Sequence, residues 1–284
     1  MAPTSRPPTL RQRRLGAELR RLRERTDMSA TEAGTHFGAS QSRVSSIEAG
    51  RYAVSADRVR ALASLYNCAD QELIEALTQM TGRQTRGWWE QDREVLPAGL
   101  LDMAELEHHA VSVRAATMVH IPGLLQTRGH AYALFDATVP PLPPPAVEHR
   151  VSFRIKRQGI LYGGEPTLLT AIIHEAALRM GVGGPNVARG QLQHLVEMSE
   201  RENIKLVVVP FGAGPLHGSG HPIDYFGGTV PQLDTVQLDT DHGTVLLDSE
   251  AHLVKYRSVL DHLESYALTP AASRNLIHRA AKTL

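Results

Sequence analysis

The segment between Ser29 and Gly50, SATEAGTHFGASQSRVSSIEAG, constrains the fold of this chain more than any other stretch. Ser29 and Glu32 have the spacing of a capping box, in which each residue satisfies a free backbone N–H at the start of a helix. Gly38 can adopt the left-handed conformation that ends a helix, and Ser40 can cap the helix that follows. The pattern therefore predicts two short helices joined by a tight turn.

Three further short helices are predicted around this pair. Leu15, Leu19 and Leu22 form one apolar stripe of a helix over residues 10–25. A fourth helix follows its cap at Ser55, and a fifth helix carries Leu73 and Leu77. We predict an all-α domain over residues 10–82, preceded by a disordered tail at residues 1–9, which are rich in Pro, Ser and Thr.

Charge is distributed unevenly along the chain. The whole chain has 30 basic and 30 acidic residues, but residues 1–60 contain twelve arginines against six acidic residues. A basic block at the start of a neutral chain is typical of nucleic-acid binding, although a solvated helix face gives the same count.

In a helix-turn-helix, the second helix lies in the DNA major groove and presents its first side chains to the bases. Gln41 suits a bidentate contact to adenine, and Arg43 suits guanine. Glu48 carries the wrong charge for DNA, so we expect it to pair with an arginine of the first helix. The candidate DNA-binding residues are Ser40, Gln41, Ser42, Arg43, Ser45, Ser46, Arg51, Arg20 and Arg21.

Beyond a polar linker at residues 81–87, the pattern changes to mixed helices and strands. We predict a multidomain protein in which the all-α helix-turn-helix bundle precedes an α+β domain over residues 83–284. Its expected helices are 100–110, 128–135, 146–158, one from 174, 186–199, 252–266 and 270–282. Its expected strands are 115–121, 168–173, 204–210, 223–226, 235–238 and 244–247, with antiparallel pairing of the last three.

Candidate ligand or partner residues of this second part form three groups. Trp88 and Trp89 suit a pocket or, as the simpler alternative, core packing. Arg150, Arg154 and Arg157 share one helix face, which suits an anion or an acidic partner as well as ion pairs with acids such as Glu148. His217 and His221 flank a glycine-rich loop that suits a pocket mouth. These candidates are Trp88, Trp89, Arg150, Arg154, Arg157, His217 and His221.

Several kinds of site are not expected. Residues 217–252 contain histidines and carboxylates but no zinc-type spacing such as HExxH or CxxC, so we predict no metal site. GxSxG and P-loop patterns are also missing, so we predict neither a catalytic site nor a cofactor. The single cysteine, Cys68, allows no intrachain disulfide. No signal peptide or membrane span is recognisable, which predicts a cytoplasmic protein without membrane contact.

The stretch SQSRVSSIEAGRY and the helix after it resemble the Cro/C1-type (XRE-family) helix-turn-helix domain. Ala30 departs from that family, which usually has Gln at this position. Trp88-Trp89, IPGLLQT, HEAALRMGVGG and VVVPFGAG resemble a domain of unknown function (DUF5753-like) common in actinomycete regulators of this family. Such regulators are often encoded near small acidic partner proteins, and some act on development or secondary metabolism.

These observations lead us to expect a transcription regulator that binds double-stranded DNA. A homodimer is expected because a single small domain contacts few base pairs. The second domain is expected to sense a small-molecule effector or a small acidic protein. Two alternatives stay open: an enzyme built on a regulator-like scaffold, and a module that acts by sequestering a partner.

Overall fold

The computed structural model describes residues 7–81, 87–216, 220–240 and 242–284. The chain forms two compact units. The first contains Met1–Leu106 and Thr229–Leu233, and the second contains Glu107–Gly228 and Asp234–Leu284. Each unit is described by itself. The expected disordered tail lies largely outside the described residues, as does most of the expected linker.

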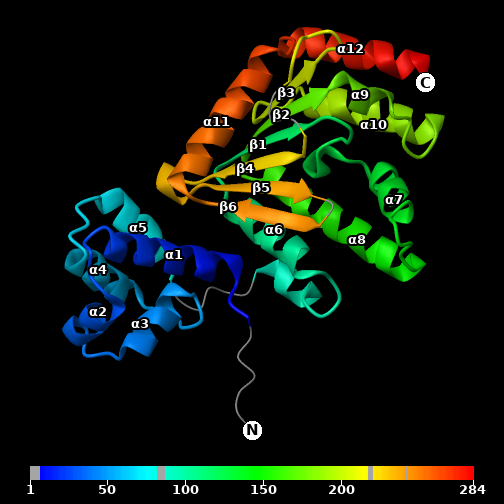
Figure 1. Cartoon of the computed structure of the whole chain (residues 1–284). Coiled ribbons are helices and arrows are strands. Elements are labelled where there is room, and N and C mark those ends of the chain that lie inside the picture. The colour runs from blue at the N-terminus through cyan, green and yellow to red at the C-terminus, as the bar shows by residue number, and fades with distance from the viewer. Residues whose placement is uncertain (1–6, 82–86, 217–219, 241) are drawn as a thin grey trace. The chain divides into compact units, whose positions relative to one another are not determined.

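The first unit begins with the five predicted helices (Figure 1). The three predicted serine caps, Ser29, Ser40 and Ser55, are confirmed, while Thr9 and Asp70 cap the first and fifth helices. The Oγ of Ser29 accepts from the backbone N–H of Glu32, whose carboxylate accepts from the N–H of Ser29 at 2.7 Å. Ser55 caps the fourth helix by a single bond, in which its Oγ accepts from the backbone N–H of Arg58 at 3.3 Å. The helices are α1 (Leu10–Glu24), α2 (Ala30–His36), α3 (Gln41–Glu48), α4 (Ala56–Leu65) and α5 (Gln71–Gln79).

One core holds these helices together. Leu19 and Leu77 are almost completely buried in it, and Leu15 and Leu22 complete the predicted stripe of α1. Val230, from the Thr229–Leu233 segment, is buried in the same core although it lies far away in the sequence. Burial of these side chains supplies most of the stability of such short helices.

Glycine allows α1 and α3 to approach closely. A Cβ atom added at Gly16 would lie 2.5 Å from the carbonyl oxygen of Glu48 and 2.6 Å from that of Ile47. These are backbone atoms, which cannot rotate away as a flexible side chain could. The close approach sets the position of α3, the helix predicted to contact DNA.

We therefore expect Gly16→Ala to lower the free energy of unfolding of the first unit by about 1–3 kcal/mol, because the two helices must separate. Urea unfolding followed by tryptophan fluorescence measures this change, since both tryptophans lie in the first unit. Gly190→Ala is the control, and calorimetry follows its own unit: Gly190 lies in α10 (Pro185–Met198) of the second unit, with no atom within 4 Å of the added Cβ. It should be neutral or stabilising. Equal stability of wild type and Gly16→Ala would contradict the steric argument.

The second unit is built on a six-stranded sheet (Figure 1). The strand order is β3-β2-β1-β4-β5-β6, parallel among β1 to β3 and antiparallel from β1 through β4 and β5 to β6. The predicted antiparallel pairing of the last three strands is confirmed. The strands are β1 (Ser112–Thr117), β2 (Leu168–His174), β3 (Ile204–Val209), β4 (Ile223–Gly227), β5 (Thr235–Thr240) and β6 (Gly243–Leu247).

The first strand differs from its prediction. The expected range was 115–121, but β1 ends at Thr117. Its last partner in β4 is Ile223, where β4 begins, so the chain beyond Thr117 has no antiparallel neighbour on that side. Strand pairing therefore decided the boundary, which the apolar run alone could not.

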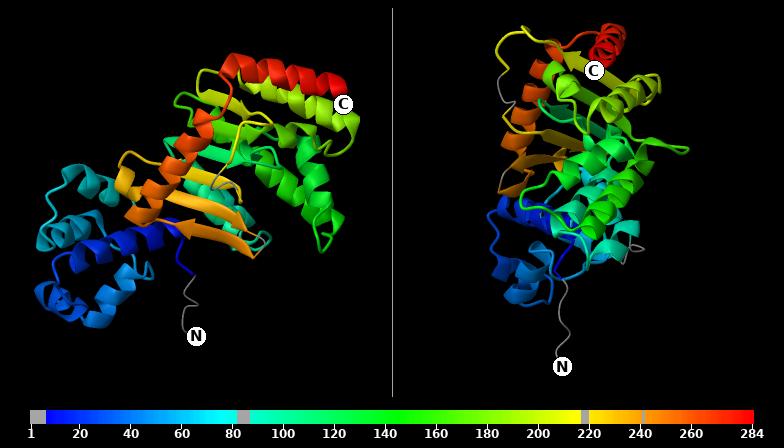
Figure 2. Two further views of the ribbon diagram at one scale, coloured as in Figure 1. Left: turned by 45° about the horizontal axis from the view of Figure 1, so that its top comes forward. Right: turned by 90° about the vertical axis from the view of Figure 1, so that its right-hand side faces the viewer.

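Helices cover both faces of the sheet (Figure 2). On one face, Leu253 and Leu260 of α11 (Glu250–Ser265) pack in a core with Ile223 and Val236. The last helix protects the edge strand β3, because the Oγ of Ser273 accepts from the N–H of Val208 at 2.9 Å. The other helices of this unit include α7 (Arg128–Asp136), α8 (Pro144–Arg157), α9 (Glu175–Arg179), α10 and α12 (Pro270–Thr283).

The α+β class of the protein is therefore as predicted. No described helix combines the length and the apolar character needed to cross a bilayer.

Candidate nucleic-acid interface

Helices α2 and α3 form a helix-turn-helix with a compact turn. Gly38 has φ +59°, the left-handed conformation that the sequence required of it. The N–H of Ala39 donates to the carbonyl of Gly34 at 2.8 Å, which closes the turn. Ser40 caps α3, accepting from the N–H of Arg43 at 3.3 Å. Local sequence therefore sets the angle at which α3 leaves the turn.

The first turn of α3 presents polar side chains to solvent. Ser40, Gln41 and Ser42 are exposed, whereas Val44 is buried in the core. The amide of Gln41 donates to Ser45 Oγ at 3.1 Å, and the hydroxyls of Ser40 and Ser42 lie 2.9 Å apart. These are short local bonds that a bound base could replace.

Arg43 lies against an aromatic ring that the sequence analysis did not select. Its guanidinium carbon is 3.1 Å from the centroid of the Tyr52 ring, a cation–π stack. Tyr52 itself is 40% exposed, so the pair is accessible from solvent. The stack holds the guanidinium in place and reduces the conformational entropy that it would lose on binding a base. The sequence feature that could have indicated this contact is the aromatic residue directly after Gly50-Arg51.

An ion pair fixes α3 to α1. The guanidinium of Arg23 donates twice to the carboxylate of Glu48, at 2.6 and 2.9 Å, and both side chains are at least 90% buried. Arg23 also donates to the carbonyl of Met28 at 2.6 Å. Hydrogen bonding to Glu48 raises the pKa of Arg23. The expectation that Glu48 pairs with an arginine of the first helix is confirmed.

The candidate phosphate contacts lie at different positions. Arg20 is exposed and donates to Glu24 at 2.6 Å, and Arg21 is half-buried beside Glu18 at 2.9 Å. Arg51 is exposed in the turn after α3. The half-buried residues Ser45 and Ser46 lie on α3 itself. Part of the basic charge of α1 is therefore balanced by neighbouring acids, which lowers its contribution to a positive field.

Arg58 was not selected from the sequence either. It lies at the start of α4, with its guanidinium 5.8 Å from the ring of Phe37 in the turn between α2 and α3. A half-buried arginine beside this turn is a further candidate for contact with a DNA phosphate. Its only sequence signal was its position three residues after the Ser55 cap.

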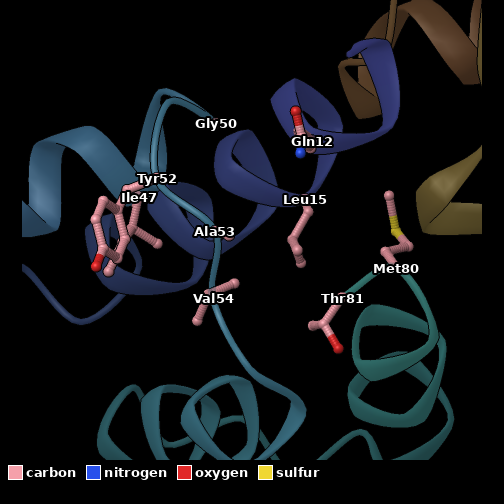
Figure 3. Close-up of a pocket in the computed structure, with 9 residues that line it drawn as sticks. All are labelled: Gln12, Leu15, Ile47, Gly50, Tyr52, Ala53, Val54, Met80 and Thr81. Atoms are coloured by element: carbon pink, nitrogen blue, oxygen red, sulfur yellow. The ribbon is translucent and has the colours of Figure 1, made fainter. Parts of the chain in front are cut away.

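A small pocket lies behind α3 (Figure 3). Its lining residues are Gln12, Leu15, Ile47, Gly50, Tyr52, Ala53, Val54, Met80 and Thr81. The volume of about 20 Å³ holds roughly one water molecule. This pocket is therefore too small for an effector.

Other candidate residues are spread over both units. Trp88 and Trp89 lie in the first unit with their rings edge to face, 5.9 Å between centroids. Trp89 is only 4% exposed, so the packing alternative holds for it. His217 lies outside the described residues, and His221 is exposed. Among the residues that the structure describes, no three His, Cys, Asp or Glu side chains are grouped as metal ligands would be.

The arginines of α8 do not form a solvated stripe. Arg157 is 4% exposed and donates two hydrogen bonds to Glu107, at 2.6 and 2.7 Å. Arg154 is half-buried and donates to Gln126 at 2.6 Å. Arg150 is also half-buried. Glu148, considered as a partner for this stripe, instead forms an ion pair with Arg128.

Comparison with known proteins gives two family matches. Residues 14–77 match a family described as a helix-turn-helix domain, and residues 100–279 match one described as a domain of unknown function, DUF5753. Neither the curated proteins nor the solved structures that were compared include a match. The second match spans more than half of the chain. The protein therefore belongs to the DUF5753 family and has an XRE-like helix-turn-helix domain at its N-terminus.

Proposed function

We propose that this protein is a sequence-specific transcription regulator that reads bases with the first turn of α3. The helix-turn-helix domain indicates a DNA-binding regulator. The observation that carries the proposal is the exposed polar surface of α3, with Gln41 facing solvent and Arg43 held on Tyr52. Gln41 suits adenine and Arg43 suits guanine, while Arg51 and Ser40 suit phosphates. DNA binding also places its site of action in the compartment that holds the chromosome.

A homodimer on a palindromic site is part of this proposal. The helix-turn-helix presents few base-reading side chains, and each mismatched base pair costs only about 1–3 kcal/mol. Two copies on half-sites about one helical turn apart supply the missing discrimination. Light scattering of the protein with and without duplex tests this, and a monomer in both states would contradict it.

The second unit is proposed to sense a small molecule. Its interior holds charged and polar groups, among them the Arg157–Glu107 pair, which suit a small polar effector better than a flat protein interface does. A small acidic protein remains the second candidate, because Arg128 and Arg150 lie on helices at the surface of this unit. The chain passes between the two units at 106–107, 228–229 and 233–234, so a change in one can reach the other through three covalent connections.

We expect Arg43→Ala to weaken specific binding by about 1–3 kcal/mol and to relax selection at one base pair of each half-site. The reason is the loss of a two-pronged donor that only guanine matches in the major groove. Selection from a random duplex pool, performed with wild type and variant, measures the change in base preference.

Two controls separate base reading from charge. Arg43→Lys keeps the charge but loses the planar fork, so affinity should fall less than specificity. Arg21→Ala should lower affinity for all duplexes alike and reduce the salt dependence. An unchanged selected sequence with Arg43→Ala would refute the role of this residue.

A further inference from the structure

The second unit contains buried polar atoms that have no hydrogen-bond partner within the described part of the chain. Besides Nε of Arg201 and of Arg257, they are Oγ1 of Thr117, Oε1 of Gln237, both ring nitrogens of His130 and Nε of Arg154. Thr117, Gln237 and His130 are 6%, 1% and 4% exposed. Because buried polar atoms in native proteins are nearly always hydrogen-bonded, such a concentration requires an explanation.

The strand residues of this group lie on one face of the sheet. Ala116, Val236 and Leu238 pack with α11. Side chains alternate along a strand, so Thr117 and Gln237 lie on the opposite face.

Asp224 belongs to the same face. It pairs in register with Gln237 and lies between Ile223 and Tyr225, both of which pack with α11. Asp239 follows on this face and accepts from the amide of Gln237 at 3.2 Å. Gln237 is buried, Asp224 is half-buried and Asp239 is exposed, so this row of polar side chains runs from the sheet interior to the surface.

The helices supply the other side of the group. A Cβ added at Gly123 would lie 3.7 Å from both Nε of Arg154 and Nη2 of Arg157, so the two guanidinium groups converge beside this glycine. Arg154 also lies over the ring of Phe135 at 4.3 Å. We call Thr117, His130, Arg154, Arg157, Asp224, Gln237 and Asp239 the polar cluster.

Charge interactions connect the two sides. Burial raises the pKa of Asp224 to about 7, Asp239 and Glu107 raise it as well, and Arg157 and Arg154 oppose them. Burial lowers the pKa of His130 to about 4, with a further contribution from Arg154. Asp224 nevertheless keeps part of its surface exposed. This carboxyl is therefore shielded by its neighbours but can still be reached from solvent.

The charges of the polar cluster nearly cancel. Glu107 balances Arg157, and Asp239 is opposite in charge to Arg154. An anionic ligand would be placed near Asp224 and Asp239, which opposes its binding. The unpartnered atoms include a donor in Arg154, an acceptor in Gln237, and the hydroxyl of Thr117, which does both. Hydroxyl groups, which donate and accept at once, match this mixture.

We propose that the polar cluster binds a small uncharged molecule rich in hydroxyl groups, such as a nucleoside or a sugar. This proposal rests on the sensing role proposed above and assigns it a site. The ligand would supply the hydrogen bonds that Thr117, Gln237 and His130 lack.

Equilibrium dialysis of the full-length protein tests this proposal. The bath holds a defined mixture of ribonucleosides, neutral mono- and disaccharides, their phosphate esters and amino acids, and mass spectrometry identifies what the protein retains. We expect retention of a neutral hydroxylated member, and at least tenfold weaker binding of that member by Thr117→Val and by Gln237→Leu. Thr170→Val is the matched control, because Thr170 lies on the α11 face of neighbouring β2 with Ile172 and should bind like wild type.

The melting temperature of each variant without ligand separates binding from structure. Thr117→Val replaces a buried hydroxyl without a partner by an apolar group, so it should leave the melting temperature unchanged or raise it. Gln237→Leu also removes the hydrogen bond to Asp239, so its melting temperature should fall by no more than the small amount expected for one hydrogen bond. Retention of nothing, or of charged members alone, would overturn the proposal, as would equal binding by Thr117→Val and Thr170→Val. The measurement contains no DNA, so a failure of DNA binding does not affect it. If the ligand binds but does not change the affinity for DNA, the proposed binding site stands and the sensing role is refuted.

Discussion

Glu48→Ala is expected to lower the free energy of unfolding of the first unit by about 3–5 kcal/mol. The substitution leaves the guanidinium of Arg23 buried without the carboxylate that accepts two of its hydrogen bonds. The carbonyl of Met28 and the half-exposed carboxylate of Glu24, 3.7 Å away, remain beside it. An isolated buried charge costs far more than a lost surface contact. Since α3 rests on this pair, DNA binding should fail at temperatures where the wild type still binds.

Tryptophan fluorescence during urea unfolding measures this effect, because Trp88 and Trp89 both report on the first unit. Glu75→Ala is the control in the first unit: both members of its ion pair with Arg60 are at least half exposed, so the change should be slight. The double variant Arg23→Met with Glu48→Leu removes both charges and should recover most of the lost stability. If Glu48→Ala were no more destabilising than Glu75→Ala, the Arg23–Glu48 pair would not hold α3 in place.

Asp224→Asn is expected to raise the melting temperature of the second unit, and to raise it more at pH 8 than at pH 5. The folded pKa of Asp224 is about 7, above the ordinary value of 3.8. Between these two values the folded state binds more protons than the unfolded state, so the stability contributed by Asp224 falls as the pH rises. This difference between the folded pKa and the ordinary pKa corresponds to at most a few kcal/mol in the free energy of unfolding. Asparagine is uncharged at every pH, so the variant loses this dependence of stability on pH.

The charged groups around Asp224, together with His130, determine how the stability of the wild type changes with pH. Asp239 and Glu107 repel the charged form of Asp224, whereas Arg157 and Arg154 attract it. His130 acts in the opposite direction, because its folded pKa of about 4 lies below 6.5 and stability is lost as the pH falls through this range.

Between about pH 4 and 6.5, the opposite effects of Asp224 and His130 on the free energy of unfolding therefore offset each other in the wild type. In Asp224→Asn only the effect of His130 remains of the two, so this variant should lose stability as the pH falls. Calorimetry measures the transition of the second unit, and tryptophan fluorescence identifies that of the first. A pH-independent difference between variant and wild type would show that Asp224 ionises normally.

Local sequence was sufficient for most of the first unit. Caps such as Ser29 and Ser40, the glycine at position 38 and the leucine stripe of α1 act within a few residues, so their effects can be read without knowing the fold. Glu48 was also predictable, since an acid on a DNA-facing helix requires a cation nearby. Tyr52 beneath Arg43 was missed because the contact depends on how the chain folds back after Gly50.

By itself, the sequence determined the helix-turn-helix, the polarity of α3, the α+β class and most element positions, because caps, turns and hydrophobic periods act over short distances. Tertiary structure alone decided the strand order, the place of Val230 in the first core and the partner of Arg157. The same holds for the polar cluster, whose members come from β1, β4, β5, α7 and α8. Their proximity results from strand register and helix packing between distant segments, and no short-range pattern records either.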